Sequence, residues 1–193
     1  MTRRVLLVIG HPRAASYCHA LAEAYASGAN QAGHELRRLD LAGAEFDPVL
    51  HVGYSSAMPL EAILVEAKEA ITWADHLVFV YPTWWGGLPA VLKGFIDRVF
   101  LPGFAFKYRE DSIWWDKLLK GRSAQLLVTM DTPPFYYKWM YRAPGHNQMK
   151  KTVLEFCGIA PVRIATYGSI KTSTDAKRAK WLAEAQAIGA ALR

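Results

Sequence analysis

Two segments of this sequence combine residue types that could hold a flat, phosphorylated ligand. One runs from Gly10 to Ala20 (GHPRAASYCHA) and is rich in histidine and hydroxyl side chains. The other runs from Tyr81 to Phe100 (YPTWWGGLPAVLKGFIDRVF) and places two adjacent tryptophans between a proline and two glycines. Hydroxyls and free N–H groups at a helix start favour phosphate, and aromatic side chains beside glycines can border a planar ring.

The first segment lacks the GxGxxG pattern of dinucleotide-binding loops. It offers His11, Arg13, Ser16 and Tyr17 just before or at the start of a predicted helix, where the helix dipole attracts phosphate. The same residues also fit an ordinary strand-to-helix turn with Ser16 as its N-cap. The local sequence leaves both interpretations open.

In the second segment, Gly86 and Gly87 let the backbone approach a ligand closely. Trp84 and Trp85 can then border its ring. The alternative is that both tryptophans pack in the core. We favour the planar ligand, because two large aromatic residues in a loop rich in glycine and proline are unusual in a core.

Five apolar runs alternate with five helical patterns along the chain. The predicted strands are residues 4–10, 34–40, 76–81, 123–130 and 162–167, and the predicted helices are 16–31, 60–74, 89–100, about 150–156 and 174–192, with a loop at 41–59. This alternation predicts an α/β fold with helices on both faces of a five-stranded parallel sheet. The length fits one domain over residues 1–193 and the smaller doubly wound order 2-1-3-4-5. Ligands then bind where the order reverses, between the first and third strands, which brings the two segments together.

Composition excludes several other classes of protein. No apolar run has the roughly 18 residues of a membrane span, and no secretory signal is evident, so we expect a cytoplasmic protein without membrane insertion. Cys18 and Cys157 form no CxxC pair, which argues against a disulfide scaffold or a metal site; we expect Cys18 to be a structural thiol. The net charge of +6 comes from scattered basic residues, so we expect no nucleic-acid partner; such charge also attracts phosphorylated cofactors.

The stretch PTWWGGLPAVLKGFIDRVF, followed by PGFAFKY, closely resembles the flavodoxin-like NAD(P)H:quinone oxidoreductase family. His11-Pro12 with Ser16, Phe156-Cys157-Gly158 and the closing helix also match, so the resemblance covers essentially the whole chain. It implies a three-layer flavodoxin-like fold and a non-covalently bound flavin. The short connection between the second strand and the next helix favours FMN, with FAD possible.

The resemblance also implies which residues bind the cofactor. Residues that match the family's isoalloxazine wall are Pro82, Thr83, Trp84, Trp85, Gly86 and Gly87, and those that match its phosphate site are His11, Ser16, Tyr17, Cys18 and His19. We also assign Thr129 and Asp131, which open the third site loop, to the cofactor site. In the family, the residues that match Phe106 and Tyr108 help to close the site from a partner subunit. The resemblance therefore implies a homodimer.

The third site loop departs from the family pattern. Family members often carry a glycine-rich turn here, then a tyrosine and a histidine that contact flavin and acceptor. This chain reads TMDTPPFYYKWMYRAPG from Thr129 to Gly145. Tyr137 falls at the tyrosine position without gaps, whereas His146 reaches the histidine position only with a small insertion. Both are candidate catalytic residues; the alternative is that both are surface loop residues.

The implied activity is a two-electron, ping-pong transfer of hydride. NADPH or NADH would reduce the flavin, and a quinone would then take its place and accept the electrons. Backbone N–H groups around Thr83 to Gly86 would stabilise negative charge on the reduced ring, and Tyr137 or His146 could donate a proton to the acceptor. Three alternatives stay open: a reductase of azo, nitro or free flavin compounds, an ancillary regulatory subunit of a potassium-efflux system, and an electron-carrier flavodoxin, which the basic charge disfavours.

Overall fold

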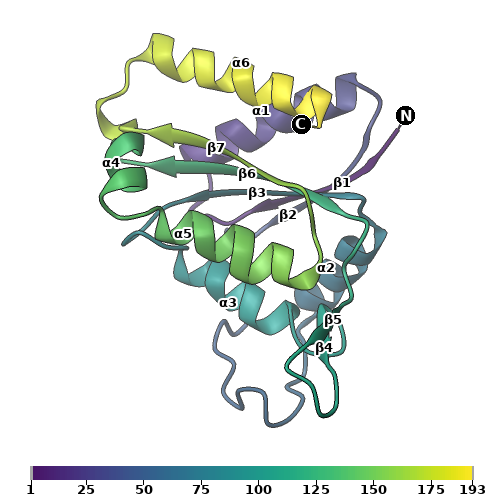
Figure 1. Cartoon of the computed structure of the whole chain (residues 1–193). Coiled ribbons are helices and arrows are strands. Elements are labelled where there is room, and N and C mark those ends of the chain that lie inside the picture. The colour runs from purple at the N-terminus through teal and green to yellow at the C-terminus, as the bar shows by residue number, and fades with distance from the viewer. Residues whose placement is uncertain (1, 193) are drawn as a thin grey trace.

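A computed structural model describes residues 2–192 and contains one five-stranded parallel sheet (Figure 1). Its strands are β1 (Arg4–Ile9), β2 (Glu35–Asp40), β3 (His76–Pro82), β6 (Ser123–Met130) and β7 (Val162–Gly168). They lie in the order β2-β1-β3-β6-β7, and every neighbouring pair is parallel. Counted within the sheet this is 2-1-3-4-5, so the predicted flavodoxin-like order is confirmed.

Helices cover both faces of the sheet because both faces are apolar. On one face lie α1 (Tyr17–Gln31) and α6 (Asp175–Ala191); on the other lie α2 (Ala62–Trp73), α3 (Ala90–Val99), the short α5 (Pro144–Asn147) and a π-helical segment (Gln148–Glu155) (Figure 1). Successive β1 side chains point to opposite faces, so Leu6 and Val8 enter one core while Leu7 and Ile9 enter the other. All seven residues of β3 are buried, as the apolar run predicts for a central strand.

Two glycines set the close packing of α1 on α6. A Cβ at Gly28 would lie 1.9 Å from the carbonyl oxygen of Gln186, and one at Gly189 would lie 2.1 Å from that of Tyr25. Neither helix could keep this distance with a larger residue there. The contact fixes α1, and therefore the start of α1, against the rest of the molecule.

The predicted loop after β2 is irregular in the structure, and a buried arginine organises it. Arg98 of α3 is fully buried. Its guanidinium donates to the Glu61 carboxylate at 2.9 Å, to the Pro59 carbonyl at 2.7 Å and to the Asp47 carbonyl. The loop is thus tied to a helix by one side chain.

Five short elements lie outside the predicted pattern. They are β4 (Phe106–Tyr108) paired with β5 (Trp115–Lys117) as an antiparallel hairpin, α4 (Pro134–Trp139), α5, and a 3-10 turn (Ile170–Thr172). The helix predicted near residues 150–156 is present, but as the π-helical segment. Within residues 2–192, no helix has both the length and the apolar character needed to cross a bilayer.

Candidate functional site

The carboxyl ends of β1, β3 and β6 border a cleft of about 290 Å³. It is lined by His11, Arg13, Ser16, Tyr17, Cys18, Pro82, Thr83, Trp84, Thr129, Met130, Asp131 and Ile170. The cleft lies where the strand order reverses, and it brings together most of the residues that the sequence assigns to the cofactor. The two segments singled out by their chemistry are therefore neighbours.

One end of this cleft is the start of α1. Ser16 occupies the N-cap position, but its hydroxyl makes no capping bond; it pairs with the ring of His19 instead. The first N–H groups of any helix lack an intrahelical partner and carry its positive dipole end. The cleft thus ends in a surface suited to an anion.

Tyr17 and Cys18 hold this helix start in place. The Tyr17 hydroxyl donates to the Arg178 carbonyl at 2.9 Å, which ties α1 to α6. The sulfur of Cys18 lies 3.4 Å from the Thr129 hydroxyl. Burial raises the pKa of Cys18 to about 11, so it is a neutral thiol at physiological pH.

His11 presents a donor to the cleft. Its Nδ1 accepts a hydrogen bond of 3.0 Å from the Arg13 backbone N–H, and burial lowers its pKa, so the ring is neutral near pH 7. A neutral imidazole whose Nδ1 accepts carries its proton on Nε2. The ring meets Trp84 edge-on, with centroids 5.7 Å apart.

The tryptophan segment forms a tight turn. Trp84 N–H donates to the Gly87 carbonyl at 3.1 Å, and Gly87 N–H donates to the Trp84 carbonyl at 2.9 Å. Trp85 and Gly86 both have positive φ, 51° and 78°, as a type I′ turn requires. A tryptophan tolerates this backbone poorly, and its side chain is fully exposed.

The turn also decides which N–H groups can reach a ligand. The Thr83 N–H already donates to the Thr129 carbonyl at 2.7 Å, and that of Trp84 closes the turn. In the described part of the chain, no acceptor contacts the N–H of Trp85 or Gly86. Of the N–H groups from Thr83 to Gly86 that the sequence suggested, only those of Trp85 and Gly86 are therefore available to donate to a bound ring among the described residues.

A second cleft of about 500 Å³ adjoins the first and shares Thr83 with it. It is lined by Thr83, Trp85, Gly86, Thr132, Tyr137, Tyr141 and Pro144. Tyr137 is buried, so its alternative as a surface loop residue is wrong. Its hydroxyl donates to the Gly86 carbonyl and accepts from the Gly145 N–H, both at 2.9 Å.

His146 packs against the ring of Tyr137. The two rings meet edge-on with centroids 5.0 Å apart. Burial lowers the pKa of His146, so it is neutral near pH 7. Its Nε2 is buried without a partner among residues 2–192, and the ring lines neither of the two clefts.

Four other predicted site residues line neither of these two clefts. His19 is buried and faces Asp40, and Gly87 closes the tryptophan turn. Phe106 and Tyr108 line a separate cleft of about 520 Å³ beside α3 and the π-helical segment. No described residue belongs both to that cleft and to the first two.

Comparison with known proteins defines the class. A family described as having the flavodoxin-like fold matches residues 3–190, so the chain belongs to this family. It is 29% identical over 179 residues to an uncharacterized NAD(P)H oxidoreductase of Haemophilus influenzae, a match that covers 90% of this chain and 87% of the relative. The structure of an NAD(P)H:quinone oxidoreductase from Methanothermobacter marburgensis has 25% identity and a TM-score of 0.80, with 100% of this chain and 98% of that chain covered.

The name of a third relative includes a cofactor, FMN. An FMN-dependent NADH:quinone oxidoreductase of Caldicellulosiruptor saccharolyticus is 35% identical over 97 residues, which cover 48% of this chain and 45% of the relative. The resemblance expected from the tryptophan segment and its flanks is confirmed by these relatives.

Proposed function

We propose that this chain is an FMN-dependent NAD(P)H oxidoreductase that reduces quinones. The observation that carries the proposal is the pair of adjoining clefts at the switch point of the sheet. One ends in a helix start suited to a phosphate, and the other is walled by an exposed tryptophan. The names of the relatives support the same activity.

The residues present fit an FMN molecule. The start of α1 and His11 Nε2 offer donors for its phosphate. The N–H groups of Trp85 and Gly86, which have no acceptor among residues 2–192, offer donors for the polar edge of its ring. When bound, the flavin would supply the hydride chemistry and pass on two electrons. The contribution of the chain is to orient the ring and to place donors where negative charge develops.

The second cleft suits alternating occupants. Trp85, Tyr141 and Pro144 form exposed walls, and the cleft volume of about 500 Å³ is within the range that small-molecule sites use. A nicotinamide and then a quinone would occupy this space in turn, which gives ping-pong kinetics. We propose that Tyr137 orients the tryptophan turn rather than protonating the acceptor, because its hydroxyl hydrogen is engaged by Gly86.

We also propose a homodimer. Phe106 and Tyr108 lie away from the first two clefts within one chain, so they can close the site only from a second copy. Sedimentation that shows only monomer at micromolar concentration would contradict this. A cytoplasmic location stays part of the proposal, because reduced pyridine nucleotides are intracellular donors.

Initial-rate measurements test the proposed function. NADPH or NADH and a simple benzoquinone are varied together with the FMN-loaded protein. Parallel double-reciprocal lines are expected, because the two substrates never occupy the site together. Intersecting lines, or no turnover with either donor after loading with FMN or FAD, would contradict the proposal.

The regulatory alternative is not favoured, because the relatives are named as oxidoreductases. The same reduced flavin could also reduce azo or nitro compounds. A comparison of turnover rates with quinone, azo and nitro acceptors identifies the preferred class.

A further inference from the structure

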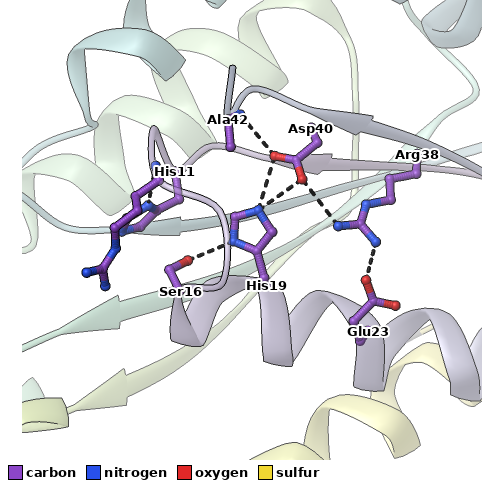
Figure 2. Close-up of polar contacts among 8 residues, drawn as sticks. His11, Ser16, His19, Glu23, Arg38, Asp40 and Ala42 are labelled. Atoms are coloured by element: carbon purple, nitrogen blue, oxygen red, sulfur yellow. Dashed lines mark hydrogen bonds and ion pairs between the residues drawn. The ribbon is translucent and has the colours of Figure 1, made fainter. Parts of the chain in front are cut away.

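Ser16, His19 and Asp40 form a continuous chain of hydrogen bonds at the start of α1, which is the end of the first cleft suited to an anion (Figure 2). The Ser16 hydroxyl oxygen lies 2.8 Å from Nδ1 of His19. On the other side of the ring, Nε2 lies 2.9 Å and 3.2 Å from the two carboxylate oxygens of Asp40. Ser16 also lines the cleft, so the chain connects the cleft to a carboxylate at the end of β2.

The chain is held rigidly. Ser16 is 7% exposed and His19 is 8% exposed. The Asp40 carboxylate accepts from the Ala42 backbone N–H at 3.0 Å and from Arg38 at 3.2 Å. The guanidinium of Arg38 in turn pairs with Glu23 on α1, as Figure 2 shows. These contacts leave the imidazole little freedom to turn.

The direction of the Ser16 hydroxyl depends on the protonation of His19. A neutral ring that donates Nε2–H to Asp40 has a bare Nδ1, which takes the hydroxyl hydrogen of Ser16. Only oxygen lone pairs then face the cleft, and they repel an anion. A protonated ring donates from both nitrogens, so Nδ1–H donates to the Ser16 oxygen and the hydroxyl hydrogen is free to point into the cleft.

The charges around His19 favour the second arrangement when an anion is bound. From β2 it faces the Asp40 carboxylate, whose negative charge stabilises an imidazolium; Arg38 lies beyond that carboxylate and is paired with Glu23. From the loop before α1 it faces the ring of His11, with centroids 6.3 Å apart. His11 is neutral near pH 7 because burial lowers its pKa, so it adds no competing positive charge.

We propose that His19 and Asp40 are positioning residues, which turn the Ser16 hydroxyl into a donor for the phosphate of the bound flavin. This inference rests on the proposed function. It replaces direct phosphate contact by His19, which the sequence suggested, because both ring nitrogens are engaged within the chain. Binding of the phosphate and protonation of His19 then favour each other.

Riboflavin separates this role from a structural one, because it has the flavin ring and ribityl chain but no phosphate. Affinities of the flavin-free protein for FMN and for riboflavin are measured by quenching of flavin fluorescence. Ser16→Ala, His19→Gln and Asp40→Asn are each expected to weaken FMN binding about tenfold, the effect of one hydrogen bond to a charged group. Riboflavin binding is expected to change by less than about twofold. Asp75→Asn is the matched control, because its carboxylate pairs with Arg4 at the start of β1 and lines neither cleft; it should leave both affinities unchanged.

The pH profile gives a second readout. Above about pH 7 a phosphate monoester is already mostly dianionic, so its own titration no longer contributes. Wild-type affinity for FMN should fall as the pH is raised above about 7, because the proposed arrangement needs a proton on His19, whereas affinity for riboflavin should stay level. His19→Gln should abolish the fall. The double variant Ser16→Ala/His19→Gln should bind FMN no more weakly than Ser16→Ala alone.

Equal losses of FMN and riboflavin affinity in His19→Gln or Asp40→Asn would overturn the inference, since that pattern belongs to a structural role. So would unchanged FMN affinity in both variants, or the same pH profile for FMN in wild type and His19→Gln. Melting curves identify any variant that fails to fold. If His19→Gln or Asp40→Asn does not fold, Ser16→Ala decides the question: a pH profile of FMN affinity equal to that of wild type would then overturn the inference. A wild-type protein that binds no flavin at all contradicts the proposed function itself.

Discussion

Trp85 is the residue whose geometry most directly suggests a ligand. Its side chain is fully exposed and its backbone is held at positive φ. We expect Trp85→Ala to weaken flavin affinity about fivefold, since one stacked aromatic contributes on the order of 1 kcal/mol beyond area burial. Trp73, at the end of α2 with Arg37 over its ring at 4.3 Å, is the control: Trp73→Ala should leave flavin affinity unchanged. Fluorescence titrations compare the two, and equal affinities in Trp85→Ala and wild type would show that the ring lies elsewhere.

Tyr137 provides a test that separates positioning from proton transfer. Tyr137→Phe removes both hydrogen bonds of the hydroxyl, but the Gly145 N–H still donates to the Gly86 carbonyl at 2.9 Å. The loss of unfolding free energy should therefore be about 0.5–1.5 kcal/mol. Urea denaturation measures this loss. A variant that keeps its stability but loses kcat would assign the hydroxyl to the acceptor step instead.

His76 makes stability depend on pH. It is buried at the start of β3, where burial lowers its pKa to about 4, against an ordinary value near 6.5. Between these values the unfolded chain binds the extra proton, so stability rises with pH across this window and is lost as pH falls through it. The full shift corresponds to roughly 3 kcal/mol. His76→Asn should flatten the dependence of Tm on pH between about 4 and 6.5; an unchanged slope would show that other groups cause it.

At the scale of residues, the sequence predicted which loops meet but not how their side chains are engaged. His11, Ser16 and Trp84 were predicted to share a site because sheet topology dictates where loops meet. His19 lies on α1 and its partner Asp40 lies at the end of β2, where the register of β1 with β2 sets Asp40 beside Ile9. No local spacing contains that information.

At the scale of elements, long apolar runs predicted the strands well and short elements were missed. β4 and β5 have three residues each, fewer than periodicity can detect. In α4 only Tyr137 is buried, while Phe135 and Trp139 are exposed, so no apolar stripe marks it. Pro134 in its first turn was an available helix-start signal.

Arg98 is the element-scale contact that sequence patterns did not indicate. Arg98→Met would leave Glu61 and two loop carbonyls without their buried partner, and we expect a loss of about 3–5 kcal/mol in unfolding free energy. Arg109→Met removes an exposed pair with Asp116 and should cost less than about 1 kcal/mol. Chemical denaturation of both variants tests the contrast. Similar losses would show that the loop is not anchored through Arg98.

At the scale of the whole molecule, the fold explains why residues far apart in sequence form one site. Parallel strands bring the loops after β1, β3 and β6 to one edge, and the helices on both faces fix them there. The aromatic residues of β4 stay outside this edge in a single chain. The molecule therefore supplies two adjoining clefts at this edge. We propose that they hold the flavin and its substrates, and that a second copy completes the enclosure.

The most direct test is anaerobic mixing of the FMN-loaded protein with NADPH, and separately with NADH, while the visible flavin absorbance is followed. We predict one flavin per chain, loss of its absorbance with at least one donor before any acceptor is present, and recovery when a quinone is added to the reduced protein. A protein that retains neither FMN nor FAD, or whose bound flavin neither donor reduces, would contradict the account.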